Sequence, residues 1–383
     1  MKHGWEYKKF TDVCDVQYGF AFDSKFFTDD ENAMPLIRIR DVMRGYSETF
    51  YNGEIPNGYL INEGDYLVGM DGEFNIGRWG KRPGLLNQRV CKMSSSSKLL
   101  DNQYMYYFMK VCLKSIEDET PFVTVKHLSA KRINQIEIPL PPLLTQQSIA
   151  SELDKINELI RLKKEQLKDY DNLAQSIFYE MFGDPVVNEK GWDNSTIESV
   201  CSSIVRGPFG SALKKEFFVE STNDTYKVYE QKHAIQKNHI IGSYYITKEK
   251  FQELRRFEVF PGDIIMSCSG TIGEFYQIPK EAEKGVMNQA LLKFTLNENR
   301  TTTEFFMFLM NFIKNSFETK GTGLQNIGSV KVIKSTILGL PPLPLQQLFA
   351  QRIELIEKQK AEVQRTIADL KTLLASRMQY WFD

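Results

Sequence analysis

The chain has 383 residues, of which 48 are Lys or Arg, 49 are Asp or Glu and 42% are hydrophobic, and this composition excludes a disordered tail. At roughly 100 to 200 residues per domain, two domains are expected rather than one small core. The formal net charge of -1 excludes a globally basic nucleic-acid binder, so any DNA-binding surface must be a local patch on a neutral body.

The N-terminal segment and the cysteines indicate a cytoplasmic protein without membrane contact. Met1 to Lys9 contain no apolar signal core, and the longest apolar stretch, Phe305 to Ile313, is too short for a membrane span. The 5 cysteines are scattered and include no Cys-x-x-Cys pair, so the sequence suggests neither a disulfide framework nor a zinc site. We expect a reducing compartment and no metal.

The first globular part, residues 1–139, is expected to mix strands with one helix. The helix should start after Asp101, a good N-cap residue, and run to about Glu117 with an aromatic and Met-rich inner face. Short apolar runs bounded by Gly, Asn and Pro predict strands. In this part they are Pro35–Ile39, Asp65–Gly69 and Gln135–Ile138.

Residues 140–183 predict a long helix with a coiled-coil seam. After Leu140-Pro-Pro-Leu143, apolar residues alternate in steps of four and three, which is the spacing of such a seam. The seam residues are Ile149, Leu153, Ile156, Ile160, Leu167, Tyr170 and Ile177.

The second half of the chain repeats the first. Residues 184–339 again predict a mixed part, with a strand at Asp263–Met266 and a helix from Thr302 to about Glu318, and residues 340–383 predict the second long helix. Leu340-Pro-Pro-Leu343 and Gln346-Gln347 recur 200 residues after Leu140-Pro-Pro-Leu143 and Gln146-Gln147. The second seam contains Phe349, Ile353, Ile356, Val363, Ile367, Leu370 and Leu374.

Two matching seams favour pairing of the helices with each other, although each could instead lie on its own domain. A helix of about 37 residues is roughly 55 Å long. The connector between Phe182 and Trp192 spans at most about 35 Å, so it cannot return the chain for parallel pairing. We therefore predict an α+β protein, in which two similar mixed α/β domains are separated by an antiparallel two-helix coiled coil with a pseudo-two-fold internal repeat.

No catalytic motif is evident. The chain lacks a Gly-x-x-x-x-Gly-Lys-Ser/Thr loop, His-Glu-x-x-His, Gly-x-Ser-x-Gly and the Asn/Asp-Pro-Pro-Tyr of amino-methyltransferases. Loops rich in Arg, Lys, Asn and Gln instead suit the reading of phosphates and base edges. The candidate DNA-binding residues are Arg38, Arg40, Arg44, Arg78, Lys81, Arg82, Lys126, Lys131, Arg206, Lys214, Lys215, Lys232, Lys320, Thr322, Gln325, Asn326 and Lys331.

The order of these motifs resembles the specificity (S) subunit of type I restriction-modification systems. The resemblance is carried by Ile138-Pro-Leu-Pro-Pro-Leu143, Leu340-Pro-Pro-Leu343, the two Gln-Gln pairs, Ile177-Phe-Tyr-Glu-Met-Phe-Gly-Asp184, Ser269-Gly-Thr-Ile-Gly273 and Lys320-Gly-Thr-Gly-Leu-Gln-Asn-Ile327. The first domain departs from the pattern, with Asp71-Gly-Glu-Phe-Asn-Ile-Gly77 where the second has Ser-Gly-Thr-Ile-Gly, and with Thr120-Pro-Phe-Val-Thr124 in place of Gly-Thr-Gly.

The resemblance implies a subunit that is not itself an enzyme and carries no cofactor. Two target recognition domains would read the unlike halves of a bipartite site in double-stranded DNA, while the helices set the spacer. Two methyltransferase subunits would carry S-adenosylmethionine, and restriction subunits would use ATP and Mg. The alternatives are a coiled-coil adaptor presenting two protein-binding domains, and a free-standing nuclease or methyltransferase with an unrecognised site.

Overall fold

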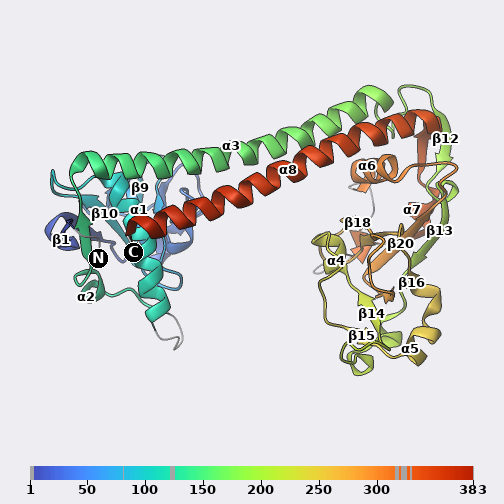
Figure 1. The fold of residues 1–383 in the computed structure, drawn as a ribbon, viewed down its shortest axis with the longest axis horizontal. Coiled ribbons are helices and arrows are strands. Elements are labelled where there is room, and N and C mark those ends of the chain that lie inside the picture. Colours follow the sequence, from blue (N-terminus) through green and yellow to red (C-terminus); the bar gives the residue numbers. More distant parts are fainter. Residues whose placement is uncertain are drawn as a thin grey trace. The chain divides into compact units, whose positions relative to one another are not determined.

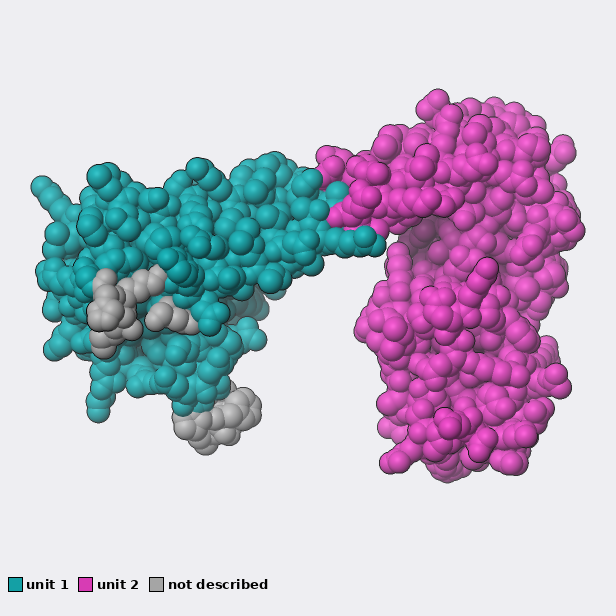
Figure 2. All heavy atoms as spheres, in the orientation of Figure 1, with its two compact units in different colours: residues 1–165, 363–383 teal, residues 166–362 magenta. Residues whose placement is uncertain are grey.

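A computed structural model describes residues 4–80, 82–120, 126–314, 319–320, 326–327 and 330–382. The chain divides into two compact units (Figures 1 and 2). Unit 1 comprises Met1–Glu165 with Val363–Asp383, and unit 2 comprises Gln166–Glu362. Each unit therefore contains a mixed globular part and one half of each long helix.

Unit 1 is built on three sheets. β1 (Glu6–Lys9) pairs with β11 (Glu137–Leu140), and a four-stranded antiparallel sheet has the order β2 (Cys14–Tyr18), β10 (Val90–Ser95), β7 (Tyr66–Gly69), β8 (Ile76–Arg78). The third sheet has the order β3 (Phe27–Thr28), β5 (Phe50–Tyr51), β4 (Met34–Ile37), β9 (Gly84–Leu86), β6 (Leu60–Ile61), in which β4 and β9 are parallel.

One amphipathic helix, α1 (Asn102–Glu119), covers the four-stranded sheet of unit 1, and α2 (Ala130–Ile133) is a single turn. The Asp101 side chain accepts a hydrogen bond from the Tyr104 N–H at 2.9 Å, which confirms the predicted N-cap. Tyr104, Met105 and Phe108 are buried on the inner face of α1, as the aromatic and Met-rich pattern predicted.

Unit 2 repeats this topology. β12 (Asp193–Thr196) pairs with β23 (Ile337–Leu340), and the four-stranded sheet has the order β13 (Cys201–Arg206), β20 (Leu291–Leu296), β17 (Ile264–Ser267), β18 (Phe275–Gln277). The second sheet has the order β15 (Tyr245–Ile246), β14 (Tyr226–Tyr229), β19 (Gly285–Met287), β16 (Glu258–Val259), and β14 and β19 are parallel like β4 and β9. Short segments complete the unit: β21 (Thr319–Lys320), β22 (Asn326–Ile327), α4 (Gln231–Ile235), α5 (Lys248–Glu253), α6 (Thr303–Ile313) and α7 (Val330–Ser335).

The long helices α3 (Leu143–Phe182) and α8 (Leu343–Phe382) have 40 residues each. In unit 1 the Arg377 side chain donates a hydrogen bond to Glu152 at 3.0 Å, and in unit 2 the Phe178 and Phe349 rings lie 5.5 Å apart. Early α3 therefore packs on late α8, and late α3 on early α8. Ile149, Leu153, Ile156, Ile160, Phe349, Ile353, Ile356, Val363 and Ile367 are buried, whereas Leu167, Tyr170, Ile177, Leu370 and Leu374 are partly buried.

Two buried glutamines fix the start of the long helices. Gln146 accepts from the Asp101 N–H at 2.9 Å and donates to the carbonyls of Leu99 and Pro141 at 2.8 and 2.9 Å. Gln346 does the same for Thr302, Arg300 and Pro341 at 3.1, 3.1 and 2.8 Å. Each glutamine thus ties the N-cap of α1 or α6 to the Pro-Pro segment before α3 or α8, which explains why this motif is repeated.

Several predicted boundaries differ from those of the structure, the strands by one or two residues and one helix end by about five. The strand predicted at Pro35–Ile39 ends at Ile37, because the Asp41 carboxylate accepts the Arg38 N–H at 2.9 Å and caps a 3-10 turn over Ile39–Asp41. The strand predicted at Gln135–Ile138 is Glu137–Leu140. The helix after Thr302 ends at Ile313, and Glu318 lies outside the described residues.

All five cysteines are free thiols, and burial raises the pKa of each to about 12. No helix among the described residues combines the length and apolarity that a membrane crossing requires. Within the same ranges, no three His, Cys, Asp or Glu side chains gather as metal ligands.

Candidate nucleic-acid interface

Three loops meet at one end of the four-stranded sheet in unit 1, here called the three-loop end. The first loop follows β2, the second joins β7 to β8, and the third precedes β10. The Gly19 N–H donates to the Val90 carbonyl at 3.0 Å, and the Met70 N–H donates to the Arg89 carbonyl at 2.9 Å. Gly19 is required for this approach, because a Cβ there would lie 2.0 Å from the Asn87 carbonyl oxygen.

Unit 2 builds the same three-loop end from equivalent residues. The Gly207 N–H donates to the Leu291 carbonyl at 3.0 Å, and the Cys268 N–H donates to the Ala290 carbonyl at 2.8 Å. A Cβ on Gly207 would lie 1.8 Å from the Asn288 carbonyl oxygen. The same backbone hydrogen bonds thus recur in both units, and the side chains beside them differ.

In unit 1 the three-loop end presents polar and charged side chains. The Arg89 Nε lies 3.4 Å from the Asp71 carboxylate, and the His127 ring contacts the other oxygen of the same carboxylate. Asp71 and His127 also form an isolated backbone bridge, which anchors the β7–β8 loop. Gln88 is exposed beside them, and its N–H donates to the Phe20 carbonyl at 2.8 Å.

In unit 2 the same end is an open hollow of about 740 Å³. Arg206, Arg256, Ser269 and Gln289 line it, together with Phe209, whose side chain is 89% exposed. The Arg206 Nε donates to the Gln289 carbonyl at 3.0 Å. Two guanidinium groups and an exposed ring with no acidic residue among the described lining suit a phosphate backbone and the π-face of a base.

Other lysines form ion pairs within the fold. Lys92 pairs with Asp65 at 2.9 Å, and the equivalent Lys293 pairs with Asp263 at 3.0 Å. Buried Lys227 lies 2.8 Å from Glu283. Burial lowers the pKa of His233, whose ring nitrogen lies 2.7 Å from the Ile241 carbonyl, so this histidine is a neutral structural residue.

The structure distributes the predicted DNA-binding residues over several surfaces. Arg206 lies at the three-loop end, and Lys126 lies next to it, since its carbonyl accepts the Gly72 N–H at 2.9 Å. The Lys126 ammonium group, however, donates to the Glu117 carbonyl at 2.5 Å, and Arg82 donates to the carbonyls of Glu31 and Ala33 at 2.6 and 3.2 Å. These two side chains therefore have structural contacts of their own.

The remaining predicted residues lie elsewhere. Arg38, Arg40, Arg44, Arg78, Lys131, Lys214, Lys215 and Lys331 are exposed, and Lys232 is partly buried. Of these, Arg40, Arg44, Lys214 and Lys232 pair with Asp41, Glu48, Glu216 and Glu230. Lys81, Thr322 and Gln325 lie outside the described residues, as does the Gly321 to Gly323 turn, and Lys320 and Asn326 are described only as backbone of β21 and β22.

Sequence reasoning missed most of the three-loop end. Gln88, Arg89, His127, Phe209 and Arg256 were not among the predicted residues. A signal was present, because the Asn87-Gln88 pair recurs as Asn288-Gln289. The density of basic residues along the chain could not locate the site, because the loops that form it are far apart in sequence and meet only through strand pairing.

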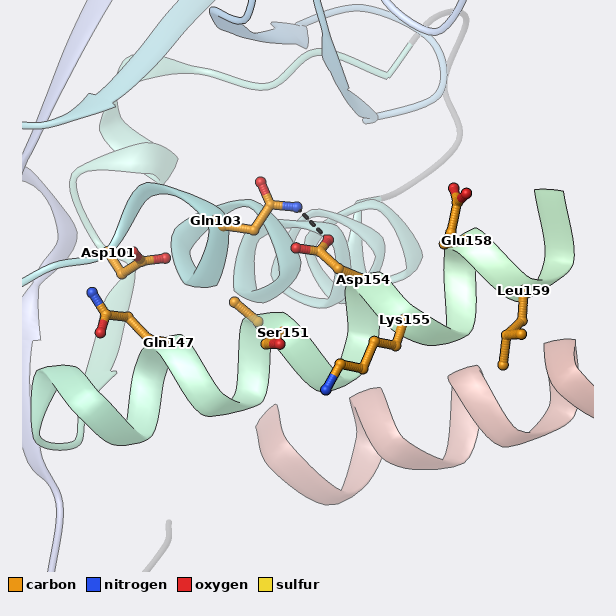
Figure 3. A pocket seen from close by; sticks show the side chains of 9 residues that line it. Asp101, Gln103, Gln147, Ser151, Asp154, Lys155, Glu158 and Leu159 are labelled. Atoms are coloured by element: carbon orange, nitrogen blue, oxygen red, sulfur yellow. Dashed lines mark hydrogen bonds between the residues drawn. The ribbon is translucent and has the colours of Figure 1, made fainter. Parts of the chain in front are cut away.

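A second hollow, of about 680 Å³, lies in unit 1 between the start of α1 and the outer face of α3 (Figure 3). Asp154 accepts hydrogen bonds from Gln103 and Tyr107, both at 2.6 Å. Asp101 and Glu158 add two further carboxylates, against the single ammonium group of Lys155. This excess of carboxylates disfavours phosphate binding in the hollow, so its chemistry differs from that of the three-loop end.

The comparisons with known proteins agree on one family. Residues 2–169 and 189–371 match the family described as "Type I restriction modification DNA specificity domain". The type I restriction enzyme EcoBI specificity subunit of Escherichia coli is 43% identical over 38% of this chain, a match that spans only 30% of that subunit. The MjaVIII specificity subunit of Methanocaldococcus jannaschii is 22% identical over 82% of this chain and 79% of its own length.

Solved structures show the same fold. A type I restriction-modification S subunit from M. genitalium covers 100% of this chain and 98% of its own with a TM-score of 0.51 and 13% identity. A chain from a structure described as the basis of complex assembly and conformational transition of the type I R-M system gives a TM-score of 0.62 and 16% identity, covering 100% of this chain and 98% of its own.

Proposed function

Because the chain belongs to the type I restriction-modification DNA specificity family and carries that family's domain twice, we propose that each unit reads one half of a bipartite site in double-stranded DNA. The observation that carries this proposal is the three-loop end, which is built twice with the same backbone hydrogen bonds. Gln88, Arg89 and Asp71 occupy it in unit 1, where unit 2 has Gln289, Ala290 and Ser269. Because base readout depends on side chains, the two half-sites should differ.

The long helices are proposed to form an antiparallel coiled coil that sets the unread spacer between the half-sites. Contacts between α3 and α8 in both units and the burial of most seam residues support this. In this proposal, residues 1–139 and 184–339 are recognition domains related by a pseudo-two-fold axis, and residues 140–183 and 340–383 are spacer helices.

We further propose that two methyltransferase subunits dock on these helices and that restriction subunits join the complex. Exposed leucines on α3 and α8 provide apolar contact area, among them Leu144, Leu159, Leu173, Leu355 and Leu373. S-adenosylmethionine would then be bound by the methyltransferase subunits, and ATP with Mg by the restriction subunits. This chain would supply recognition without catalysis.

The proposal is tested by mapping adenine methylation in the host genome with and without this gene. The expected result is a split motif with unlike halves that disappears on deletion. Purified chain in complex with its methyltransferase partner should also bind that motif with an affinity that falls as salt rises. A methylome unchanged by deletion and an absence of salt-dependent, sequence-specific binding would instead support the protein-binding adaptor.

A further inference from the structure

Arg89 adopts a backbone conformation that its residue type disfavours. It is the third residue of the turn Asn87–Val90, closed by the Val90 N–H on the Asn87 carbonyl at 3.3 Å, and its φ is 70°. That position of a turn normally takes Gly or Asn when φ is positive. Among the described residues, only Asn188 and Lys237 share a positive φ without being glycine, and Ala290, at the equivalent place in unit 2, does not.

The Arg89 side chain is also held in place. Its Nε faces the Asp71 carboxylate at 3.4 Å, and its Nη1 lies 3.5 Å from the His127 ring. Asp71 is itself fixed by the His127 bridge and by the loop that leaves β7. The guanidinium side chain nevertheless stays 55% exposed, so N–H donors remain available to a ligand at the three-loop end.

A strained residue with a buttressed, accessible guanidinium group at a loop junction has the properties of a reading residue. Backbone strain of this kind persists where the surrounding structure fixes it, and it clusters at functional sites. Arginine pairs in two-point geometry with the O6 and N7 acceptors of guanine through its rigid planar fork, whereas lysine offers a flexible ammonium group without that fixed geometry. The turn itself does not require arginine, because glycine or asparagine would close it at lower cost, so the position keeps Arg89 for its side chain.

We propose that Arg89 reads a guanine in the half-site bound by unit 1, and that Asp71 is its positioning residue. This inference rests on the proposed function of the two units and adds one base and one side chain to it. Because unit 2 has Ala290 in place of Arg89, the second half-site is read without this contact.

The test replaces Arg89 in the full chain, co-expressed with its methyltransferase partner, and reads the methylated motif. Arg89→Gly is the main variant, because glycine adopts a positive φ without steric cost and therefore keeps the turn. Arg89→Lys retains the charge and removes the planar fork, while Asp71→Asn retains Arg89 and removes its carboxylate partner. Lys237→Gly is the matched control, since it also removes a cation from an exposed positive-φ position, in unit 2.

The expected result is that Arg89→Gly loses discrimination at one guanine of one half-site by about tenfold or more and that Arg89→Lys loses less, with the other half-site unchanged. Asp71→Asn should relax the same position less strongly, and Lys237→Gly should leave the motif as it is. The unchanged half-site shows in the same experiment that the variant is folded and assembled.

Two outcomes would overturn the inference while leaving the proposed function standing. The motif could be identical in wild type and Arg89→Gly. Alternatively, binding could weaken equally on all sequences with a smaller salt slope, which would make Arg89 a phosphate contact. A wild-type chain that directs no split motif at all would refute the proposed function itself.

Discussion

Gln146 and Gln346 show how a single side chain can organise a helix junction. Each amide satisfies a backbone N–H and two backbone carbonyls at the junction. The sequence displayed the repeated Gln-Gln pair, but it did not reveal which member is buried. That distinction follows from the helix direction, which points Gln146 inward and leaves Gln147 exposed.

Gln146→Leu should destabilise unit 1 by about 2 to 3 kcal/mol, because leucine fills the space but leaves the Asp101 N–H and the Leu99 and Pro141 carbonyls unsatisfied. Urea unfolding measures the loss. Gln147→Leu is the matched control, since its side chain is exposed and should change stability by less than about 0.5 kcal/mol. Equal effects of the two substitutions would contradict the role assigned to the Gln146 amide.

Among the secondary-structure elements, the long helices were predicted well from their heptad spacing. The ends of strands were predicted less well from short apolar runs. Ile149, Leu153 and Ile156 are buried in α3, as their spacing required. The strand order could not be predicted, because it is set by pairing between distant segments, such as β4 with β9. The same limit applies to the three-loop end, whose members Asp71 and Arg89 meet only through that topology.

Phe178 packs α3 against both α6 and α8 in unit 2. Its ring lies within 6 Å of the rings of Phe182, Phe305, Phe308, Phe312 and Phe349. Phe178→Ala should therefore cost about 3 to 5 kcal/mol of unfolding free energy by leaving a cavity. Leu173→Ala, on the exposed side of the same helix, should have little effect in the same denaturation assay.

Acid should weaken the contact between α3 and α8 in unit 1. Hydrogen bonds from Arg377 and Trp381 lower the pKa of Glu152 below its ordinary value. A depressed carboxylate pKa contributes stability above the unfolded-state value, about 4.3, and loses it as pH falls through the folded-state value. Glu152→Gln should therefore flatten the pH dependence of the melting temperature below about pH 5, with a small loss at neutral pH because the pair is partly exposed.

For the whole molecule, the repeat found in the sequence predicted two units of one topology, and both the strand orders and the family match support that interpretation. The half-sites themselves could not be predicted, because they depend on side chains such as Arg89 and Phe209 that differ between the repeats. The amino-acid composition could not locate the DNA-binding surface either, because the charges of Lys92, Lys227 and Lys293 are paired with carboxylates within the fold.

If the helices set the spacer, inserting one heptad into the matched middle of both α3 and α8 should lengthen it without altering either half-site. Seven residues add about 10 Å of helix, which corresponds to about three base pairs. Methylome mapping of the double insertion, with each single insertion as the control for helix mispairing, measures the change. A new half-site identity would show that the helices influence base reading directly.

The first and last strands of each globular part are neighbours. Glu6 pairs opposite Leu140, and Asp193 pairs opposite Leu340. The chain therefore enters and leaves each globular part through two adjacent, hydrogen-bonded strands, the second of which leads into a long helix. Each globular part is thus a domain whose two ends are adjacent, which we call a cassette. Recombination that exchanges one cassette for another needs no new joint in the remaining frame, which gives genes of this architecture a short route to new sequence preferences.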